Sequence, residues 1–295
     1  MNECKLCPRL CGADRTKKTG FCGAGNNIKL AKAYLHKWEE PCISYKNGAG
    51  TVFFSGCNLH CCYCQNNSIS NELFGIEVTV EKMGEIFLKL QDDGADNIEL
   101  VTPTHFVPQI IESLDKVKAR LNIPVIYNTG GYELVDTIKM LEGYIDVYLP
   151  DIKYFSADVS ARYSNAPDYF ERVSEAVPEM IRQVGKLVFN KDGGIEKGTI
   201  IRHLVLPKQR HDSMKILDWI SRNTSADDVM VSIMNQYTPF DFISDEFPEL
   251  KRRITKMEYN SVVDHAAGLG LNGFTQEKSS SSEKYVPDFD LSGIV

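Results

Sequence analysis

The sequence predicts an α/β protein: an incomplete (β/α)6 barrel of the TIM type, preceded by an irregular Cys-rich N-terminal module. Two observations carry this prediction. From residue 51 onward, short β-branched apolar runs alternate with amphipathic stretches, a pattern typical of parallel strands joined by helices. All 9 cysteines lie at or before residue 64, ahead of most of that alternation. The 295 residues are enough for one barrel-sized core.

Six segments have the composition of strands buried on both faces. They are short, rich in β-branched residues and almost continuously apolar, as parallel strands between two helical layers are. The predicted strands are Thr51–Ser55, Asn97–Val101, Pro124–Asn128, Ile145–Leu149, Ile200–Leu206 and Val229–Met234. Six strand–helix units suggest a barrel that falls short of the usual eight.

The segments between these strands have helical periodicity. In the first of them, Met83, Ile86, Phe87 and Leu90 recur at the spacing of one helix face. The predicted helices are Val80–Gln91, Val107–Leu121, Glu133–Glu142, Tyr169–Phe189, Ser213–Arg222 and Tyr259–Gly268. We therefore divide the chain into a Cys-rich module (1–50), a barrel (51–276) and a low-complexity tail (277–295), whose YVPDFD segment is expected to dock back onto the barrel.

Composition narrows the classes of function. Hydrophobic residues make up 43% and charged residues 25%, as in globular proteins in general. No apolar run reaches the roughly 20 residues that span a bilayer, and MNECKLCPRL has no apolar signal-peptide core. A cytoplasmic protein without membrane association is expected. The net charge of −7 disfavours nucleic acid as a partner, because such binding depends on cationic side chains.

The loop after the first predicted strand reads GCNLHCCYCQN, and Cys57, Cys61 and Cys64 have the spacing C-x3-C-x2-C. Thiolates are the ligands of iron–sulfur clusters, and three of them leave one iron of a [4Fe–4S] cluster open to another molecule. A structural zinc site would be expected to supply four protein ligands. Cys62 is interpreted as a non-ligand, because the spacing favours Cys61.

With these cysteines, and with Tyr63 directly before the last of them, the chain resembles the radical S-adenosylmethionine (SAM) superfamily. The resemblance implies an oxidoreductase in which a [4Fe–4S] cluster binds SAM at its open iron and cleaves it reductively. The products are methionine and a 5′-deoxyadenosyl radical, which abstracts hydrogen from the substrate. Cys57, Cys61 and Cys64 would be the catalytic cluster ligands.

Further motifs resemble one branch of that superfamily, the proteins similar to the activating enzyme of pyruvate formate-lyase. These motifs are the cysteine loop, CKLCPRLCG, HKWEEPCISYKNGAGTVFFSGCN and LVTPTHFVP. The branch implies a protein or peptide substrate, for example a glycyl-radical enzyme, and an electron donor such as flavodoxin or ferredoxin. A small molecule or another peptide is the alternative substrate, and a non-catalytic iron–sulfur electron carrier is the alternative class.

Polar residues follow the predicted strands at the end where barrels bind their ligands. The resemblance implies that some of them contact SAM. The candidates are Tyr63, Thr102, Thr104, Asn128, Thr129, Asp151, Lys153, Arg202 and Gln236. The Gly-Gly-Glu-Pro element that the superfamily often has after its second strand is replaced by Thr102-Pro103-Thr104, whose hydroxyls or carbonyls would have to substitute for it. A turn with only structural meaning is the alternative there.

Two of these elements have a more specific expectation. Asp151 and Lys153 match a D-x-K element of the activases that lies near SAM and the substrate loop, although a surface ion pair would also explain them. Arg202 lies in an apolar strand, where a buried guanidinium needs an anionic partner. Its planar fork suits the carboxylate of SAM, the role that the activase resemblance implies. His203 should face the other side of the same strand.

The N-terminal cysteines form a second candidate site. Cys4, Cys7, Cys11 and Cys22 have the spacing C-x2-C-x3-C-x10-C, and four thiolates suit zinc, a single iron or a second iron–sulfur cluster. Four unliganded thiols are the alternative. Cys42 has no assigned role.

Overall fold

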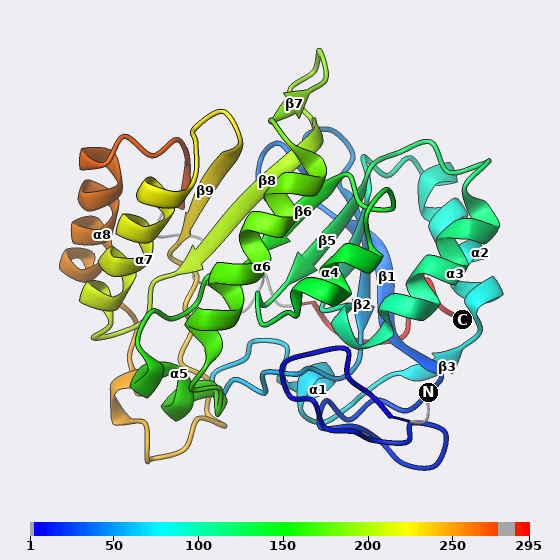
Figure 1. The fold of residues 1–295 in the computed structure, drawn as a ribbon, viewed down its shortest axis with the longest axis horizontal. Coiled ribbons are helices and arrows are strands. Elements are labelled where there is room, and N and C mark those ends of the chain that lie inside the picture. Colours follow the sequence, from blue (N-terminus) through cyan, green and yellow to red (C-terminus); the bar gives the residue numbers. More distant parts are fainter. Residues whose placement is uncertain (1–2, 277–286) are drawn as a thin grey trace.

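A computed structural model of the chain describes residues 3–276 and 287–295. Its centre is one twisted sheet with the strand order β10-β9-β8-β6-β5-β4-β2-β1-β3, and helices cover its outer face (Figure 1). The seven strands from β2 to β10 in this order pair in parallel. β3 and β10 end the strand order and do not pair with each other, so the sheet is curved but open, as expected for an incomplete barrel.

All six predicted strands are present, with ends shifted by a few residues. They are β2 (Ala49–Phe54), β4 (Ile98–Val101), β5 (Val125–Thr129), β6 (Val147–Pro150), β8 (Ile195–Leu204) and β9 (Val229–Met234). Their middle residues are buried on both faces, which explains why a continuous apolar pattern identifies them.

The structure adds strands that the sequence analysis does not predict. β1 (Ile28–His36) pairs antiparallel with β2 and with β3 (Ile76–Val78), so part of the Cys-rich module belongs to the main sheet. β10 (Gly273–Thr275) pairs in parallel with β9. β7 (Val188–Phe189) pairs with β8, in a stretch predicted to be the end of a helix. That helix ends early at Gly185, whose φ of +67° favours glycine.

The longer helices follow the predicted periodicity and fill the connections between strands. Their bounds are α2 (Val80–Asp92), α3 (Val107–Val117), α4 (Val135–Met140), α6 (Tyr169–Val184), α7 (Arg210–Asn223) and α8 (Lys256–Gly268). Shorter, unpredicted segments are α1 (Asn67–Ser70), α5 (Ala157–Ser164) and the 3-10 turns Thr104–Phe106 and Pro248–Lys251. Among the residues that the structure describes, no helix is both long and apolar enough to cross a membrane.

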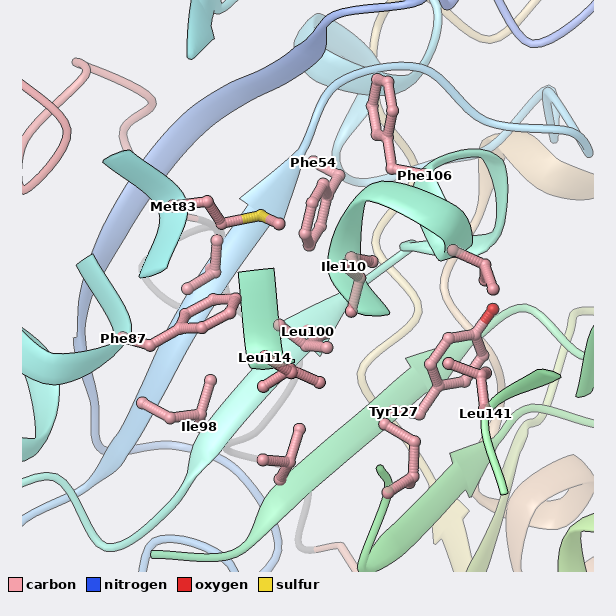
Figure 2. Packing of buried hydrophobic residues seen from close by; sticks show 14 of the residues in the cluster. Phe54, Met83, Phe87, Ile98, Leu100, Phe106, Ile110, Leu114, Tyr127 and Leu141 are labelled. Atoms are coloured by element: carbon pink, nitrogen blue, oxygen red, sulfur yellow. The ribbon is translucent and has the colours of Figure 1, made fainter. Parts of the chain in front are cut away.

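The main hydrophobic core lies between the outer face of the sheet and the helices. Figure 2 shows Phe54 and Leu100 of the sheet packed against Phe87 of α2 and Leu114 of α3. The alternation of side chains along a strand sends the intervening residues, such as Phe53, to the inner face. The inner face therefore carries a separate set of side chains, and these position the candidate site.

The end of the chain packs against β1. The Leu291 amide donates to the Ala31 carbonyl, and the Ala33 amide donates to the Ser292 carbonyl, at 3.2 and 3.0 Å. The Phe289 ring lies 5.3 Å from that of Phe53, centroid to centroid. The part of the predicted YVPDFD contact that is described, residues 287–290, thus docks as expected, whereas residues 277–286 lie outside the described residues.

The last two residues provide a matched test of this docking. Ile294 is 2% exposed and belongs to the main core, whereas Val295 is 88% exposed. Ile294→Ala should lower the free energy of unfolding by about 2–4 kcal/mol, the usual cost of removing a buried aliphatic side chain. Val295→Ala should change it by less than about 0.5 kcal/mol. Urea unfolding of both variants checks the prediction, and equal stabilities would contradict the docking.

Candidate functional site

The candidate site lies where the parallel strands end. The loop that carries the predicted cluster ligands directly follows β2 and leads into α1, and the Cys-rich N-terminal module packs beside it (Figure 1). The ends of β4, β5, β6 and β8 reach the same edge of the sheet. Loops at this edge are where barrel folds place their ligands.

Hydrogen-bond donors surround the sulfurs of the cysteine loop. The Leu59 amide lies 3.4 Å from the Cys57 sulfur, and the Ser164 hydroxyl lies 3.0 Å from the Cys61 sulfur. Burial, together with the charges of the neighbouring Cys61 and Cys64, raises the pKa of Cys57 to about 12. The thiols of Cys61 and Cys64 are thus close enough to oppose the ionisation of Cys57. A positively charged group bound among them would lower the pKa of Cys57 instead.

Three cysteine thiols are a donor set that suits an iron–sulfur cluster. Within residues 3–276 and 287–295, no three His, Cys, Asp or Glu side chains form a site for one metal ion. A cluster distributes its cysteine ligands over separate irons, so the three thiols of this loop need not meet at one point. Cys57, Cys61 and Cys64 would hold such a cluster, and the donors to their sulfurs suit thiolates.

Cys62 has different surroundings from the three predicted ligands. Its amide donates to the Tyr163 carbonyl at 2.9 Å, and burial raises the pKa of its thiol to about 12. The charged side chains that affect it include Glu249 and Arg162, which belong to the α5 side of the molecule. That Cys62 is not a ligand stays a prediction.

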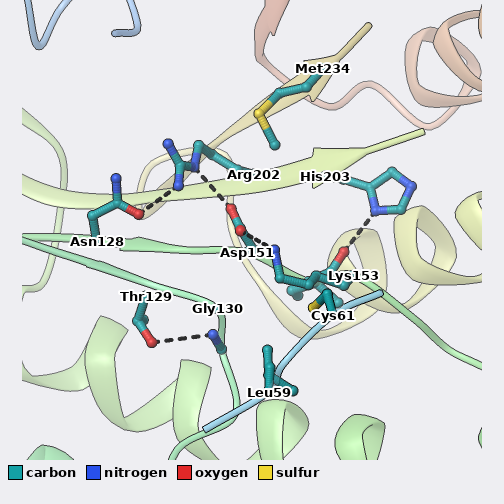
Figure 3. Close-up of polar contacts among 12 residues, drawn as sticks. Leu59, Cys61, Asn128, Thr129, Gly130, Asp151, Lys153, Arg202, His203 and Met234 are labelled. Carbon is teal, nitrogen blue, oxygen red and sulfur yellow. Dashed lines mark hydrogen bonds and ion pairs between the residues drawn. The ribbon is translucent and has the colours of Figure 1, made fainter. Parts of the chain in front are cut away.

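Four of the predicted SAM residues form one polar group on the inner face of the sheet (Figure 3). The Arg202 Nε donates to the Asp151 carboxylate at 2.9 Å, and its Nη2 donates to the Asn128 side-chain carbonyl at 2.5 Å. Lys153 forms an ion pair with the other oxygen of Asp151. Burial alone would raise the pKa of Asp151, but Lys153 and Arg202 hold it below its usual range.

Arg202 therefore has an anionic partner within the protein. Its third nitrogen, Nη1, lies 3.4 Å from the carboxylate of Glu39, in the loop after β1. The guanidinium thus has the anionic partners that a charge within an apolar strand needs. Its role toward the SAM carboxylate stays a prediction. As expected, His203 faces away, and its Nδ1 bonds to the Ile152 carbonyl at 2.7 Å.

Two predicted SAM contacts, Thr104 and Thr129, share a partner that the sequence analysis does not name. Both hydroxyls donate to the carboxylate of Glu133, Thr104 at 2.6 Å. The protons of these two hydroxyls are therefore not available for a hydrogen bond to SAM. Thr102 lies beside them with a φ of 58°, and its amide donates to the Asn128 carbonyl at 2.9 Å.

The remaining predicted contacts lie outside this polar group. The Tyr63 hydroxyl is buried and pairs with the Tyr154 hydroxyl at 2.7 Å. The Gln236 side chain bonds to Gln276 at 3.2 Å. Neither bonds to Arg202 or Asp151, so their contact with SAM stays a prediction.

The N-terminal module is bonded directly to the cysteine loop. The Cys57 amide donates to the Cys22 carbonyl at 3.1 Å. Gly56 has a φ of +92°, and a Cβ at this position would lie 2.5 Å from the same carbonyl oxygen. Only glycine permits this approach, so the loop and the module fix each other's position.

Arg9, between two of the N-terminal cysteines, strengthens this connection. Its Nε donates to the Asn58 carbonyl at 2.8 Å, and its Nη2 donates to the Ser164 carbonyl at 2.9 Å. Its guanidinium also lies 4.2 Å from the centroid of the Phe21 ring. Arg9 thus joins the module, the cysteine loop and the serine whose hydroxyl contacts the Cys61 sulfur.

The four N-terminal thiols lie near one another. The sulfurs of Cys11 and Cys22 would lie 3.4 and 3.7 Å from a Cβ at Gly20. Burial raises the pKa of Cys7 to about 12, and Cys22 and Cys4 add to this shift. As stated above, the described residues do not form a finished single-ion site, so metal binding here stays a prediction. Cys42 lies apart from both groups, buried beside Glu40.

Sequence reasoning missed several residues of the site. One is Glu99 of β4, whose carboxylate accepts from the Asn128 side chain at 2.6 Å. It carries a usable signal, because a carboxylate inside an apolar strand needs buried partners. Glu133, which follows two glycines after β5, carried a weaker one. Glu39, Arg9 and Ser164 had none, since their roles depend on contacts between segments far apart in the chain.

Comparison with known proteins gives a consistent picture. The sequence profile described as the radical SAM superfamily matches residues 51–220. An uncharacterized protein of Methanocaldococcus jannaschii is 30% identical over 280 residues, which cover 92% of this chain and 76% of that protein. A crystal structure of Streptococcus suis SuiB bound to S-adenosylmethionine is similar with a TM-score of 0.48 and 14% identity, over 75% of this chain.

The chain spans 48% of the length of that SuiB structure. A mutant of spore photoproduct lyase gives a TM-score of 0.51 at 12% identity, over 83% of this chain and 79% of that protein. At this level of identity, the likeness concerns the fold alone.

The buried carboxylate of Glu133 should make stability depend on pH. Burial raises its pKa from the ordinary 4.5 to about 7, against the opposing effect of the threonine hydroxyls. Its contribution to stability is full below pH 4.5 and is lost as pH rises through 7. Relative to Glu133→Gln, the wild type should therefore lose roughly 3 kcal/mol of unfolding free energy over this window.

Urea unfolding at pH 5 and pH 8 measures this difference. Exposed Glu85 is the matched control, and Glu85→Gln should follow the wild type at both pH values. Equal pH dependence in Glu133→Gln and the wild type would show that Glu133 is ionised in the folded protein throughout.

The predicted N-terminal metal site can be tested separately from the cysteine loop. A variant with Cys57, Cys61 and Cys64 changed to Ala should retain metal, and further substitution of Cys4, Cys7, Cys11 and Cys22 should remove it. Elemental analysis of the purified proteins provides the measurement, with Cys42→Ala as the control that should change nothing. A folded, metal-free first variant would reject the site.

Proposed function

Because the chain belongs to the radical SAM superfamily, we propose that it abstracts a hydrogen atom from a backbone carbon of a protein or peptide, as activases of glycyl-radical enzymes do. The superfamily uses a [4Fe–4S] cluster and SAM. With one electron from an external donor such as flavodoxin or ferredoxin, these groups supply methionine and a 5′-deoxyadenosyl radical that takes the hydrogen atom. The substrate is left as the radical.

The protein's own part in this reaction is to hold and orient the groups that react. The Ser164 hydroxyl donates toward the Cys61 sulfur at 3.0 Å and so fixes the position of that sulfur. Asp151 fixes the ammonium of Lys153, which is affected by the charge of Cys61 and so lies near the cluster ligands. A positive charge held there offsets the negative charge that thiolate ligands bring.

The observation that carries the peptide proposal is the open edge of the sheet. β1 lies next to that edge, and its main chain there already bonds to another segment of polypeptide, the turn with Leu291 and Ser292. Main-chain pairing of this kind accepts many sequences, as peptide-binding sheet edges do. Phe53, which contacts Phe289 of this chain end, faces the inner side of the sheet. A substrate segment bound beside it would lead toward the polar group on the same face.

A small molecule is the alternative substrate, and one observation favours it. The inner face near Arg202 is lined with charged and polar groups that are mostly buried, including Glu39 and Glu99. Such a lining suits a compact polar ligand.

The chemistry is tested first. Anaerobically reconstituted protein that is reduced with SAM present should form 5′-deoxyadenosine. Cys61→Ala should lose about four irons per chain and this activity. Cys62→Ala is the matched control and should keep both. Loss in Cys62→Ala with retention in Cys61→Ala would instead place the cluster on a shifted set of cysteines.

The substrate is tested by electron paramagnetic resonance. Reduced enzyme and SAM, incubated with glycyl-radical enzymes and with co-purifying proteins, should produce a glycine-centred doublet. A small metabolite that increases 5′-deoxyadenosine formation at least tenfold, with no protein radical for any partner, would defeat the peptide proposal in favour of the small molecule.

A further inference from the structure

Carboxylates outnumber cations on the inner face of the sheet. Around Asp151 the cations are Arg202 and Lys153, and the carboxylates whose charges act on Arg202 are Asp151, Glu40, Glu39 and Glu99. Lys32 of β1, which faces the same side as Phe53, pairs instead with Asp290. Arg202 and Lys153 both pair with Asp151, which leaves three carboxylates with only part of one guanidinium between them.

The hydrogen bonds of these three carboxylates do not balance their charge. Glu99 accepts from the Thr51 hydroxyl at 2.8 Å and from the Asn128 amide at 2.6 Å, and both donors are neutral. Glu39 lies 3.4 Å from Arg202 and 3.5 Å from the ring of His36. Burial lowers the pKa of His36 to about 4, so this ring is neutral near pH 7.

Glu40 provides an independent sign of a missing partner. Its side chain is 7% exposed, and its Oε2 is buried without a hydrogen bond. An unpaired buried carboxylate oxygen is costly, so native structures normally supply it with a donor. Burial also raises the pKa values of Glu39 and Glu99, with repulsion by Glu99 adding to the shift of Glu39.

One side of this group is open to solvent. The side chains of Glu39 and Arg202 are each 13% exposed and that of Lys153 is 17% exposed, whereas Glu99 is fully buried behind them. The group extends toward the cysteine loop through Lys153, on which the charge of Cys61 acts. Glu99 lies deeper in the sheet, where it accepts from Thr51 of β2.

We propose that Glu39, Glu40 and Glu99 bind a protonated amine or a guanidinium group of the substrate. A cation of this kind supplies the donors that the Glu40 carboxylate lacks and offsets the excess negative charge. Since the occupant is the substrate, the inference rests on the proposed function. It narrows the substrate to a cationic molecule, or to a peptide with a Lys or Arg side chain near the reacting carbon.

The test measures binding, so its outcome is independent of radical chemistry. Reconstituted protein saturated with SAM is titrated with 1,4-diaminobutane, and the melting temperature is followed. The diamine should raise it by several degrees at millimolar concentration, whereas 1,4-butanediol and sodium chloride of equal ionic strength should not. Glu40→Gln should weaken the apparent affinity at least tenfold. Exposed Glu196 is the matched control, and Glu196→Gln should leave the affinity unchanged.

The possible outcomes separate the alternatives. Glu39→Gln serves as the second variant if circular dichroism shows that Glu40→Gln is unfolded. An equal response to diamine and diol, or full affinity in both variants, would overturn the proposal. Competition between SAM and the diamine would assign the carboxylates to the ammonium of SAM and would also overturn it. A protein that binds the diamine but does not cleave SAM would contradict the proposed function and leave this site intact.

Discussion

The burial of one guanidinium constrains the inner half of the molecule. Arg202 lies within β8, and without anionic partners its charge would strongly oppose folding. The partners come from three other places: Asp151 at the end of β6, Asn128 in β5 and Glu39 in the loop after β1. The adjacent main chain is joined as well, since the Ile152 amide donates to the Arg202 carbonyl at 2.9 Å. The ends of β5 and β6 and the loop after β1 must therefore lie around the same point of β8, the Arg202 side chain.

The cysteine loop depends on its surroundings in a similar way. The Cys22 carbonyl and Arg9 hold its backbone from the N-terminal side, and Ser164 contacts Cys61 from the end of α5. The Cys-rich module is thus part of the wall around the candidate cluster site. This arrangement also explains why Gly56, which the motif itself does not require, stands directly before Cys57.

The sequence predicts the parts of this fold that depend on local pattern. The six main strands are predictable because burial on both faces leaves a continuous apolar run, as in β4 and β6. β1 is not, because Lys29 and Lys32 interrupt its apolar pattern, although Lys32 is 9% exposed and bonds to the chain end. The partners of Arg202 could be expected only as a class of residue, since a contact such as that with Glu39, 163 residues away, leaves no local trace.

The contact between β1 and residues 291–292 has a consequence for the order of folding. Ala33 and Ser292, whose amide and carbonyl bond at 3.0 Å, are separated by most of the sequence. Contacts of such long sequence separation are slow to form. On its other side Ala33 lies opposite Val52 of β2, which is far nearer in the chain. The hairpin-like pairing of β1 with β2 can therefore form while the other flank of β1 is still uncovered.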